Sequence, residues 1–227
     1  GLQAAGKTDE AKALEAPKTR AVLVDLRSSY GGGNNIAWSD DGANVAMQLQ
    51  AGDKKDRWIA TVDFDRHALQ LQHRLTDPAW VSWHFNDIGW QRDGRALWFL
   101  SEESGYAQLY TKPLDGTARA LTGGTFEASR PQLSPDGRWF YLRANKVAPY
   151  SYDVYRVPSN GGALVRVSEY QGLNDFTLAP DGSRLALTHS SAYVLPQLAV
   201  LPSAGGKPRE LTATTKPAFA ERAWIAP

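Results

Sequence analysis

The stretch IAWSDDGANVAMQLQ, residues 36–50, decides how the rest of the sequence is interpreted. Its template returns three times, as IGWQRDGRALWFLSE at 88–102, PQLSPDGRWFYLRAN at 131–145 and FTLAPDGSRLALTHS at 176–190. In each copy a large apolar residue stands third, an Asp-Gly pair follows, and an alternating apolar run ends the segment. Self-similarity of this kind indicates a repeat architecture.

Asp-Gly between two β-type runs predicts a hairpin, because a tight turn needs positive φ, which Gly tolerates and Asp accepts better than most residues. Two more strand-like runs follow each hairpin, such as RWIATVDF at 57–64 and ALQLQHRL at 68–75. Four antiparallel strands in about 40 to 50 residues match the period of a propeller blade. The sequence therefore predicts an all-β fold, a β-propeller sector of about four four-stranded antiparallel blades. The blades are expected at approximately 34–77, 86–124, 129–170 and 174–214.

The two ends of the chain predict that this is part of a larger ring. TRAVLVDL, residues 19–26, reads as a late strand of a preceding blade, and ERAWIAP, residues 221–227, as the opening strand of a following one. Together these define a partial propeller over 21–227. Residues 1–20 are interpreted as an arm or insertion, either a short helix capped by Thr8 or a surface segment. Open blade faces at the ends predict self-association.

Composition excludes several classes of function. The formal net charge is +1 and the basic residues are scattered, so we expect no nucleic-acid partner. No run approaches the about 18 consecutive apolar residues of a membrane span. The chain has no cysteine, which excludes disulfides, a thiol nucleophile and cysteine-bound zinc but suits cytoplasm and periplasm alike. The sequence starts without Met and shows no signal peptide, so we interpret it as a fragment and leave its compartment open.

Ser29, in LVDLRSSYGGGNN at 23–35, is the one serine that invites a catalytic interpretation. A nucleophile elbow needs G-x-S-x-G between a strand and a helix, because the strained turn tolerates only small flanking residues. Here Arg27 replaces the first glycine, and Gly32 and Gly33 would break any helix after the serine. We therefore interpret Ser29 as part of a loop between blades and predict no catalytic residue in this chain.

Acidic and histidine side chains give no metal or cofactor site. Asp63, Asp65 and His67 alternate and could share one side of a strand end, but no further ligands accompany them. His73 and His189 have no recognisable partner spacing. We predict neither a metal nor a cofactor.

The segment FLSEESGYAQLYTKPLDGTARALT, residues 99–122, together with the SPDG hairpin, resembles two related groups of propellers. These are TolB-like propellers and the propeller domain of the prolyl oligopeptidase family, particularly its dipeptidyl peptidase IV branch. The second resemblance is closer, because that branch has a Ser-Glu-x-x-Gly-aromatic stretch before a Leu-Tyr strand. The matching residues here are Ser101, Glu102, Gly105, Tyr106, Leu109 and Tyr110.

The resemblance implies a function for the parent protein. In that family the propeller sits over a C-terminal α/β-hydrolase domain, and it gates and orients peptide substrates for a serine peptidase. This chain would be the non-catalytic propeller portion, with the hydrolase domain and peptides as partners. The alternative is a TolB-like or WD-type propeller that acts as a protein-interaction module. A propeller enzyme with its own carbohydrate or lactone site would need a set of acidic or histidine ligands, which we do not find.

Paired glutamates hold the substrate's amino terminus in this family, but we do not transfer that role to Glu102 and Glu103. Adjacent side chains on a strand point to opposite faces, so these two could converge on one ammonium only if a turn or bulge intervened. The aromatic context of the family's glutamate motif is also missing around them.

Two aromatic segments provide the candidate substrate-binding residues. Trp83 and His84 lie in DPAWVSWHFNDIGW, residues 77–90, where the Trp residues either face a substrate or pack between blades. Tyr150 and Tyr152 lie in KVAPYSYDVY, residues 146–155, which we expect to form a loop between the second and third strands of the third copy. Such loops either contact a peptide or serve only as turns at the rim.

Overall fold

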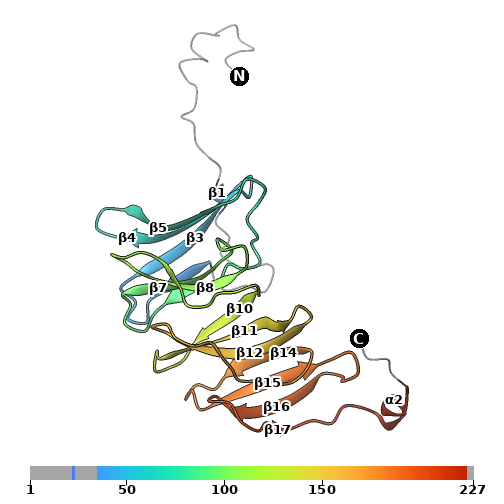
Figure 1. The fold of residues 1–227 in the computed structure, drawn as a ribbon. Coiled ribbons are helices and arrows are strands. Elements are labelled where there is room, and N and C mark those ends of the chain that lie inside the picture. Colours follow the sequence, from blue (N-terminus) through green and yellow to red (C-terminus); the bar gives the residue numbers. More distant parts are fainter. Residues whose placement is uncertain (1–21, 24–34, 224–227) are drawn as a thin grey trace, which may run out of the picture.

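The computed structural model describes residues 22–23 and 35–223, and its fold is built almost entirely of strands. Figure 1 shows the sheets following one another along the chain from β3 at one end to β17 at the other. The strands form a five-stranded, a four-stranded and an eight-stranded sheet, and the last divides at its one parallel pair, β12 with β14, into two antiparallel groups of four strands. This confirms the predicted all-β fold, and we call the four antiparallel groups blades 1 to 4. In the part of the chain that the structure describes, no helix is long and apolar enough to cross a membrane.

The strands of the first two blades follow the chain order. Blade 1 contains β2 (Ile36–Trp38), β3 (Val45–Ala51), β4 (Asp56–Asp63) and β5 (Ala68–Thr76). Blade 2 contains β6 (Ile88–Trp90), β7 (Ala96–Ser101), β8 (Gln108–Pro113) and β9 (Arg119–Ala120). Neighbouring strands in each blade pair antiparallel throughout.

The last two blades repeat this order. Blade 3 contains β10 (Ala128–Leu133), β11 (Trp139–Ala148), β12 (Ser151–Pro158) and β13 (Val165–Arg166). Blade 4 contains β14 (Leu173–Leu178), β15 (Arg184–Ser190), β16 (Gln197–Pro202) and β17 (Arg209–Glu210). A single parallel bridge between Tyr152 and Leu173 links β12 of blade 3 to β14 of blade 4.

The ends of the described chain differ from the expected flanking blades. The short strand β1 (Val22–Leu23) pairs antiparallel with the end of β3, so it belongs to the sheet of blade 1 and not to a separate preceding sheet. A short helix, α2 (Pro217–Ala220), stands just before the predicted opening strand. Residues 1–20, Ser29 and the last four residues of ERAWIAP lie outside the described residues.

The four Asp-Gly turns share one geometry. In each, the glycine N–H donates to the carbonyl oxygen three residues earlier at 2.8–2.9 Å, and φ of the glycine lies between 65 and 72°. The aspartate takes no positive φ; its carboxylate instead accepts the backbone N–H two residues on, as Asp41 does from Ala43 at 3.0 Å. The expectation that the aspartate as well as the glycine takes a positive φ is therefore wrong. The hydrogen bond of the aspartate carboxylate closes a four-residue loop, in which only the glycine occupies the left-handed region.

The segment 146–155 is more regular than the predicted loop. Strand β11 continues to Ala148 and β12 begins at Ser151, so only Pro149 and Tyr150 form the turn. An irregularity in register between Ala144 and Ala148 absorbs the remaining residues. The candidate Tyr150 therefore stands at the tip of a hairpin, and Tyr152 lies within a strand.

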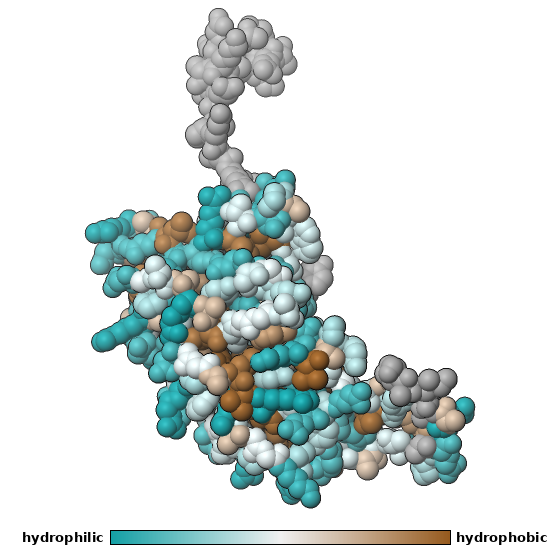
Figure 2. Space-filling model, in the orientation of Figure 1, coloured by the Kyte–Doolittle hydropathy of each residue, from teal (hydrophilic) through white to brown (hydrophobic). Residues whose placement is uncertain are grey.

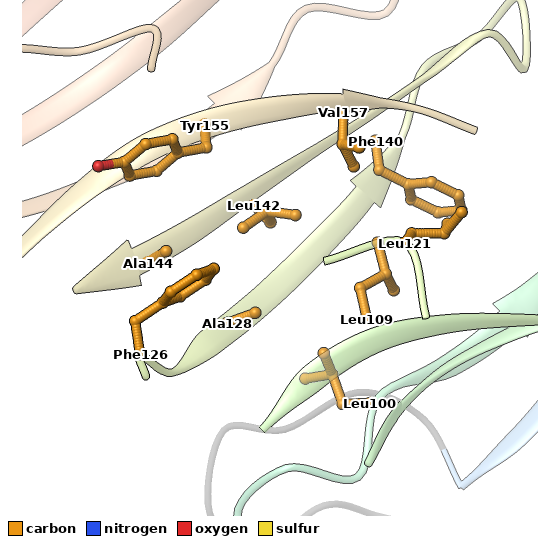
Figure 3. Packing of buried hydrophobic residues seen from close by; sticks show 10 residues of the cluster. All are labelled: Leu100, Leu109, Leu121, Phe126, Ala128, Phe140, Leu142, Ala144, Tyr155 and Val157. Atoms are coloured by element: carbon orange, nitrogen blue, oxygen red, sulfur yellow. The ribbon is translucent and has the colours of Figure 1, made fainter. Parts of the chain in front are cut away.

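The core consists of three apolar clusters, one at each junction between consecutive blades. Figure 3 shows the junction of blades 2 and 3, where Leu100 and Leu109 meet Phe126, Phe140 and their neighbours. Successive residues of one strand serve different junctions, since Phe99 packs toward blade 1 and Leu100 toward blade 3. Because a strand alternates its side chains between two faces, a sheet buried on both faces needs apolar residues at nearly every position.

The glycine of the first Asp-Gly turn provides a test of this backbone geometry. Gly42 has φ 71° and nothing within 4 Å of a built Cβ, so Gly42→Ala should strain only the backbone and lower the free energy of unfolding by about 1 kcal/mol. Gly123 is the matched control, since it has equal space and no positive φ. Gly123→Ala should be neutral or slightly stabilising in urea denaturation, and equal losses for both variants would contradict the turn geometry.

Candidate functional site

The antiparallel order of the strands divides the connections between two ends of the blades. The Asp-Gly turns join first to second strands at one end. The turns between second and third strands, and the segments that lead from one blade to the next, lie at the other. We call this second set, residues 52–55, 77–87, 102–107, 121–127, 149–150, 167–172 and 191–196, the loop end. Binding residues are disproportionately found on loops that a rigid scaffold positions.

All four predicted candidates lie at the loop end or directly beside it. Trp83 is half-buried and His84 is exposed, with the imidazole edge-on to Phe85 at a centroid distance of 5.0 Å. Tyr150 is 64% exposed at its hairpin tip, and Tyr152 is half-buried at the second position of β12. The structure does not bring the two pairs together, because blade 2 separates them along the chain. Trp90 lies in the core between blades 1 and 2.

Large apolar side chains are exposed along the same end. Figure 2 shows brown patches among the hydrophilic surface over the first sheet and over the later blades, so exposed apolar side chains are not confined to the loop end. The exposed large apolar residues of the loop end and its border are Trp80, Tyr106, Val147, Tyr150, Leu173, Val194 and Leu195. An apolar gathering of this kind marks a surface that contacts something other than water.

A buried arginine holds the loop end in place at the junction of blades 1 and 2. Arg57 on β4 is completely buried, and its Nη1 and Nη2 donate to the carbonyl oxygens of Phe85 at 2.5 Å and Leu100 at 2.7 Å. Burial lowers the pKa of Arg57 to about 10, against the opposing charges of Glu102 and other nearby carboxylates. The guanidinium therefore stays cationic at neutral pH, and it ties the segment that carries Trp83 and His84 to blade 1.

The two adjacent glutamates stand in a turn and not on a strand. The turn is closed by the N–H of Gly105, which donates to the carbonyl oxygen of Glu102 at 2.8 Å. Glu102 accepts the backbone N–H of Ser82 at 3.1 Å, whereas Glu103 contacts Nε2 of His73 at 2.7 Å. Each carboxylate therefore has its own partner, and the pair does not converge on one point. Burial raises the pKa of Glu102.

His73 links β5 of blade 1 to the turn of blade 2. Its ring lies 4.5 Å from that of Phe99 and is mostly buried, and Nδ1 has no partner among the described residues. Burial is the largest influence that lowers the pKa of His73, and the hydrogen bond with Glu103 opposes it. The sequence offered no partner for this histidine, because Glu103 becomes its neighbour only when two blades pack.

The stretch 101–110 that carries the family resemblance has a structural role in this chain. The buried Gln108 donates to the carbonyl oxygen of Phe126 at 2.7 Å and accepts the hydroxyl of Thr122 at 2.6 Å. Tyr110 stacks on Phe99 with ring centroids 5.7 Å apart. The motif therefore positions the loop end between blades 1 and 3, which explains the residue types without a catalytic role.

A cleft of about 350 Å³ opens beside this turn. Its walls carry the exposed indole of Trp80 and the carboxylates of Asp77 and Glu102. Asp77 is held by the N–H groups of Ala79 at 2.7 Å and Trp80 at 3.1 Å. Carboxylates beside an aromatic face favour a positively charged or polar ligand.

The described residues contain no assembled nucleophile. Among them no serine hydroxyl is hydrogen-bonded to a histidine ring, and no group of three histidine or acidic side chains could hold a metal ion. Asp63 accepts the N–H of Arg66 at 2.9 Å and the amide of Gln70 at 2.9 Å, within the turn between β4 and β5. His67 stands in the same turn with φ 49°.

The dependence of stability on pH tests the position of His73. The unfolded chain binds a proton on this residue near the ordinary pKa of about 6.5, whereas the folded chain binds it only at lower pH. The free energy of unfolding should therefore fall as pH is lowered from about 7 through 6.5, until the folded pKa is passed. His73→Gln should flatten this part of the curve in urea titrations.

Two comparisons make that result specific. His84→Gln, which removes an exposed imidazole, is the variant with which His73→Gln is compared. The raised pKa of Glu102 should make the free energy of unfolding rise as pH is lowered through a more acidic range. The quantity to follow is therefore the difference in free energy of unfolding between the variant and the wild type. Identical slopes for His73→Gln and the wild type would mean that His73 is not buried in solution.

Solved structures share this fold. Dipeptidyl peptidase 4 of Porphyromonas gingivalis superposes with a TM-score of 0.71 at 20% identity, over 82% of this chain and 26% of that one. A putative dipeptidyl aminopeptidase IV of Bacteroides ovatus gives 0.68 at 16% identity, over 78% and 28%. TolB of Acinetobacter baumannii gives 0.56 at 21% identity, over 89% and 47%. These likenesses confirm the β-propeller fold.

Sequence comparison identifies the family. An uncharacterized protein of Agrobacterium fabrum is 27% identical over 88 residues, which are 38% of this chain and 28% of that protein. The chain thus spans less than half the length of each of these relatives. The family described as dipeptidyl peptidase IV (DPP IV) N-terminal region matches residues 13–196. The chain therefore belongs to the dipeptidyl peptidase IV N-terminal region family.

Proposed function

We propose that this chain is the part of a serine peptidase that gates and orients peptide substrates for a C-terminal α/β-hydrolase domain of the parent protein. The family assignment supports a dipeptidyl peptidase IV-like parent. The observation that carries the gating role is the loop end, where exposed aromatic side chains stand on turns held by Arg57 and Gln108. A rigid rim with exposed aromatics can contact a peptide chain without moving.

The chain itself performs no bond cleavage in this proposal. Peptides enter past the loop end, where Trp80 and Tyr150 offer apolar contact and the cleft of Asp77 and Glu102 offers negative charge. Folded proteins are excluded because the propeller narrows the path to the active site of the hydrolase domain. The nucleophile, its histidine and its acid belong to the hydrolase domain.

The test uses the full gene product that contains this chain. Purified protein should cleave short peptides with free amino termini and leave a folded protein intact. Trp80→Ala and Tyr150→Ala should raise KM for peptides of six to ten residues by about fivefold, since an aromatic contact is worth about 1 kcal/mol. Turnover of a small chromogenic ester should stay unchanged.

Trp38→Ala is the matched control, because Trp38 is similarly exposed, at 59%, but stands beside the Asp-Gly turn of blade 1. It should not alter KM. A full gene product that binds other proteins and hydrolyses no peptide would overturn the proposal and leave a protein-interaction propeller. If the KM values of all three variants equalled that of the wild type, the loop end would have no role in substrate binding.

Self-association belongs to the same proposal when the chain is studied alone. Blade 1 exposes Trp38, Phe64, Leu69 and Leu71, and the leucines alternate with Gln70 and Gln72, so they face away from blade 2. Leu198 lies on the corresponding outer side of blade 4, since Ala199 and Leu201 face blade 3. At the three internal junctions, apolar residues of one blade pack on apolar residues of the next. The exposed leucines on the outer sides of blades 1 and 4 could pack on one another in the same way.

Sedimentation velocity across a concentration series should reveal this association. The isolated chain should form dimers or larger species at higher concentration, because burial of an exposed leucine contributes about 1.5–3 kcal/mol. Leu71→Glu should shift the equilibrium toward monomer. Val165→Glu, an exposed position on the last strand of blade 3, should not. A monomer at every concentration would refute the proposed contact.

A further inference from the structure

Arg143 has more hydrogen-bond donors than partners. It lies on β11, and its side chain is only 20% exposed. A guanidinium has five N–H donors, yet within the described chain the Arg143 side chain makes no hydrogen bond, and its Nε is fully buried without a partner. Its contacts are an oxygen of Asp175 at 3.6 Å and the ring of Tyr152 at 5.1 Å. A buried polar group without a partner calls for an explanation.

Arg57 differs from Arg143 at its terminal nitrogens and not at Nε, which in both residues is buried without a partner among the described residues. It is more deeply buried than Arg143, and both terminal nitrogens donate to carbonyl oxygens of the next blade. Nothing comparable approaches Arg143 in the described part of the molecule. The half-buried guanidinium of Arg143 therefore has one carboxylate oxygen at 3.6 Å and no acceptor within hydrogen-bond distance in the described residues.

A second arginine adds positive charge at the same place. Arg130 on β10 forms an ion pair with Asp175 through the carboxylate oxygen that Arg143 approaches. Its backbone has φ 51°, at an irregularity in the pairing of β10 with β11, which is uncommon for a long side chain. Two guanidinium groups share one carboxylate, so one positive charge is left uncompensated. Burial and the charge of Arg130 both lower the pKa of Arg143.

An aromatic pocket adjoins these two arginines through Tyr152. The ring of Tyr152 lies over Arg143, and its backbone N–H donates to the carbonyl oxygen of Gly172 at 2.8 Å. Gly172 lines a pocket of about 350 Å³ whose walls also carry Tyr150, Leu173 and Tyr193. The pocket is therefore largely apolar, with two tyrosine rings in its walls, and Tyr152 connects its Gly172 wall to Arg143.

We propose that Arg143, assisted by Arg130, is a carboxylate-binding site whose ligand places an apolar or aromatic group in the pocket of Tyr150, Leu173 and Tyr193. A carboxylate matches the planar fork of a guanidinium and accepts two parallel N–H bonds. The chemical class is an anion with an adjacent apolar group, as in an acidic or carboxy-terminal segment of a peptide. The site is separate from the cleft of Asp77 and Glu102, which favours the opposite charge.

Titration with N-acetylphenylalanine tests the site directly. This probe carries one carboxylate and one aromatic ring, and N-acetylphenylalanine amide is its neutral control. The side-chain Nε–H signal of Arg143 in a ¹H–¹⁵N spectrum should shift with the acid in a saturable manner at constant ionic strength, and not with the amide. Shifts that rise linearly, or that are equal for acid and amide, would overturn the proposal.

Substitutions separate the site from general anion attraction. Arg143→Met should weaken binding by about tenfold or more, because the bidentate contact is lost. Arg156→Met is the matched control, since Arg156 also has a buried Nε without a partner and lies over Trp139 at 4.4 Å. Arg156 adjoins a pocket that Asp136 and Asp181 line, at the Asp-Gly end, so its loss should leave the affinity unchanged.

A conservative variant covers the case in which Arg143→Met does not fold. Arg143→Lys keeps the charge but not the planar fork, so it should fold and still bind the acid more weakly than the wild type. Full affinity in Arg143→Lys or Arg143→Met would overturn the assignment. The measurement needs no peptide cleavage, so its outcome is independent of the proposed gating role.

Discussion

Each middle strand of blades 2 and 3 supplies two cores at once, and the rest of the structure depends on that arrangement. Phe140 and Leu142 on β11 face blade 2, while Tyr141 between them faces blade 4. A single blade therefore cannot bury its own apolar surface, because half of each strand points to a neighbour. The blades stabilise one another in series, and large apolar residues such as Leu71 of blade 1 and Leu198 of blade 4 remain exposed on the outer sides.

Polar side chains at the junctions determine where the connecting segments lie. Arg57 binds two carbonyl oxygens of the segment and strand that follow, and Gln108 does the same at the next junction. A buried donor without a partner costs about 1–3 kcal/mol, so only one placement of each segment satisfies these groups. These bonds hold the segments 77–87 and 121–127 of the loop end against the neighbouring blades.

Two sites of opposite charge preference emerge on this surface. The cleft beside Trp80 is acidic, and the environment of Arg143 and Arg130 is basic. They lie at different junctions, one between blades 1 and 2 and the other between blades 3 and 4. The two proposed sites therefore differ in the charge of the ligand that each would favour.

Much of the fold was predictable because its determinants are local. An Asp-Gly pair between alternating apolar runs specifies a turn through residues at most a few positions apart, and four copies specify four blades. The Asp-Gly pairs, the strands and the alternation of apolar residues all appear in the structure near their predicted places. The conformation of the aspartate and the partner of β1 were not predictable, because a side-chain hydrogen bond decided the first and strand pairing the second.

The candidate residues were identified only in part. Tyr150, Tyr152, Trp83 and His84 were selected from aromatic segments between strands, and the structure places them at the loop end or beside it. Arg57, Arg143 and the bond of His73 with Glu103 were missed. The sequence around a single arginine or histidine in a strand does not indicate which residue of another blade will contact it. The sequence alone therefore determined the repeat, the strands and the family, since these depend on neighbouring residues. Only tertiary structure decided that Arg57 finds two carbonyl oxygens and Arg143 finds none, because those oxygens belong to another blade.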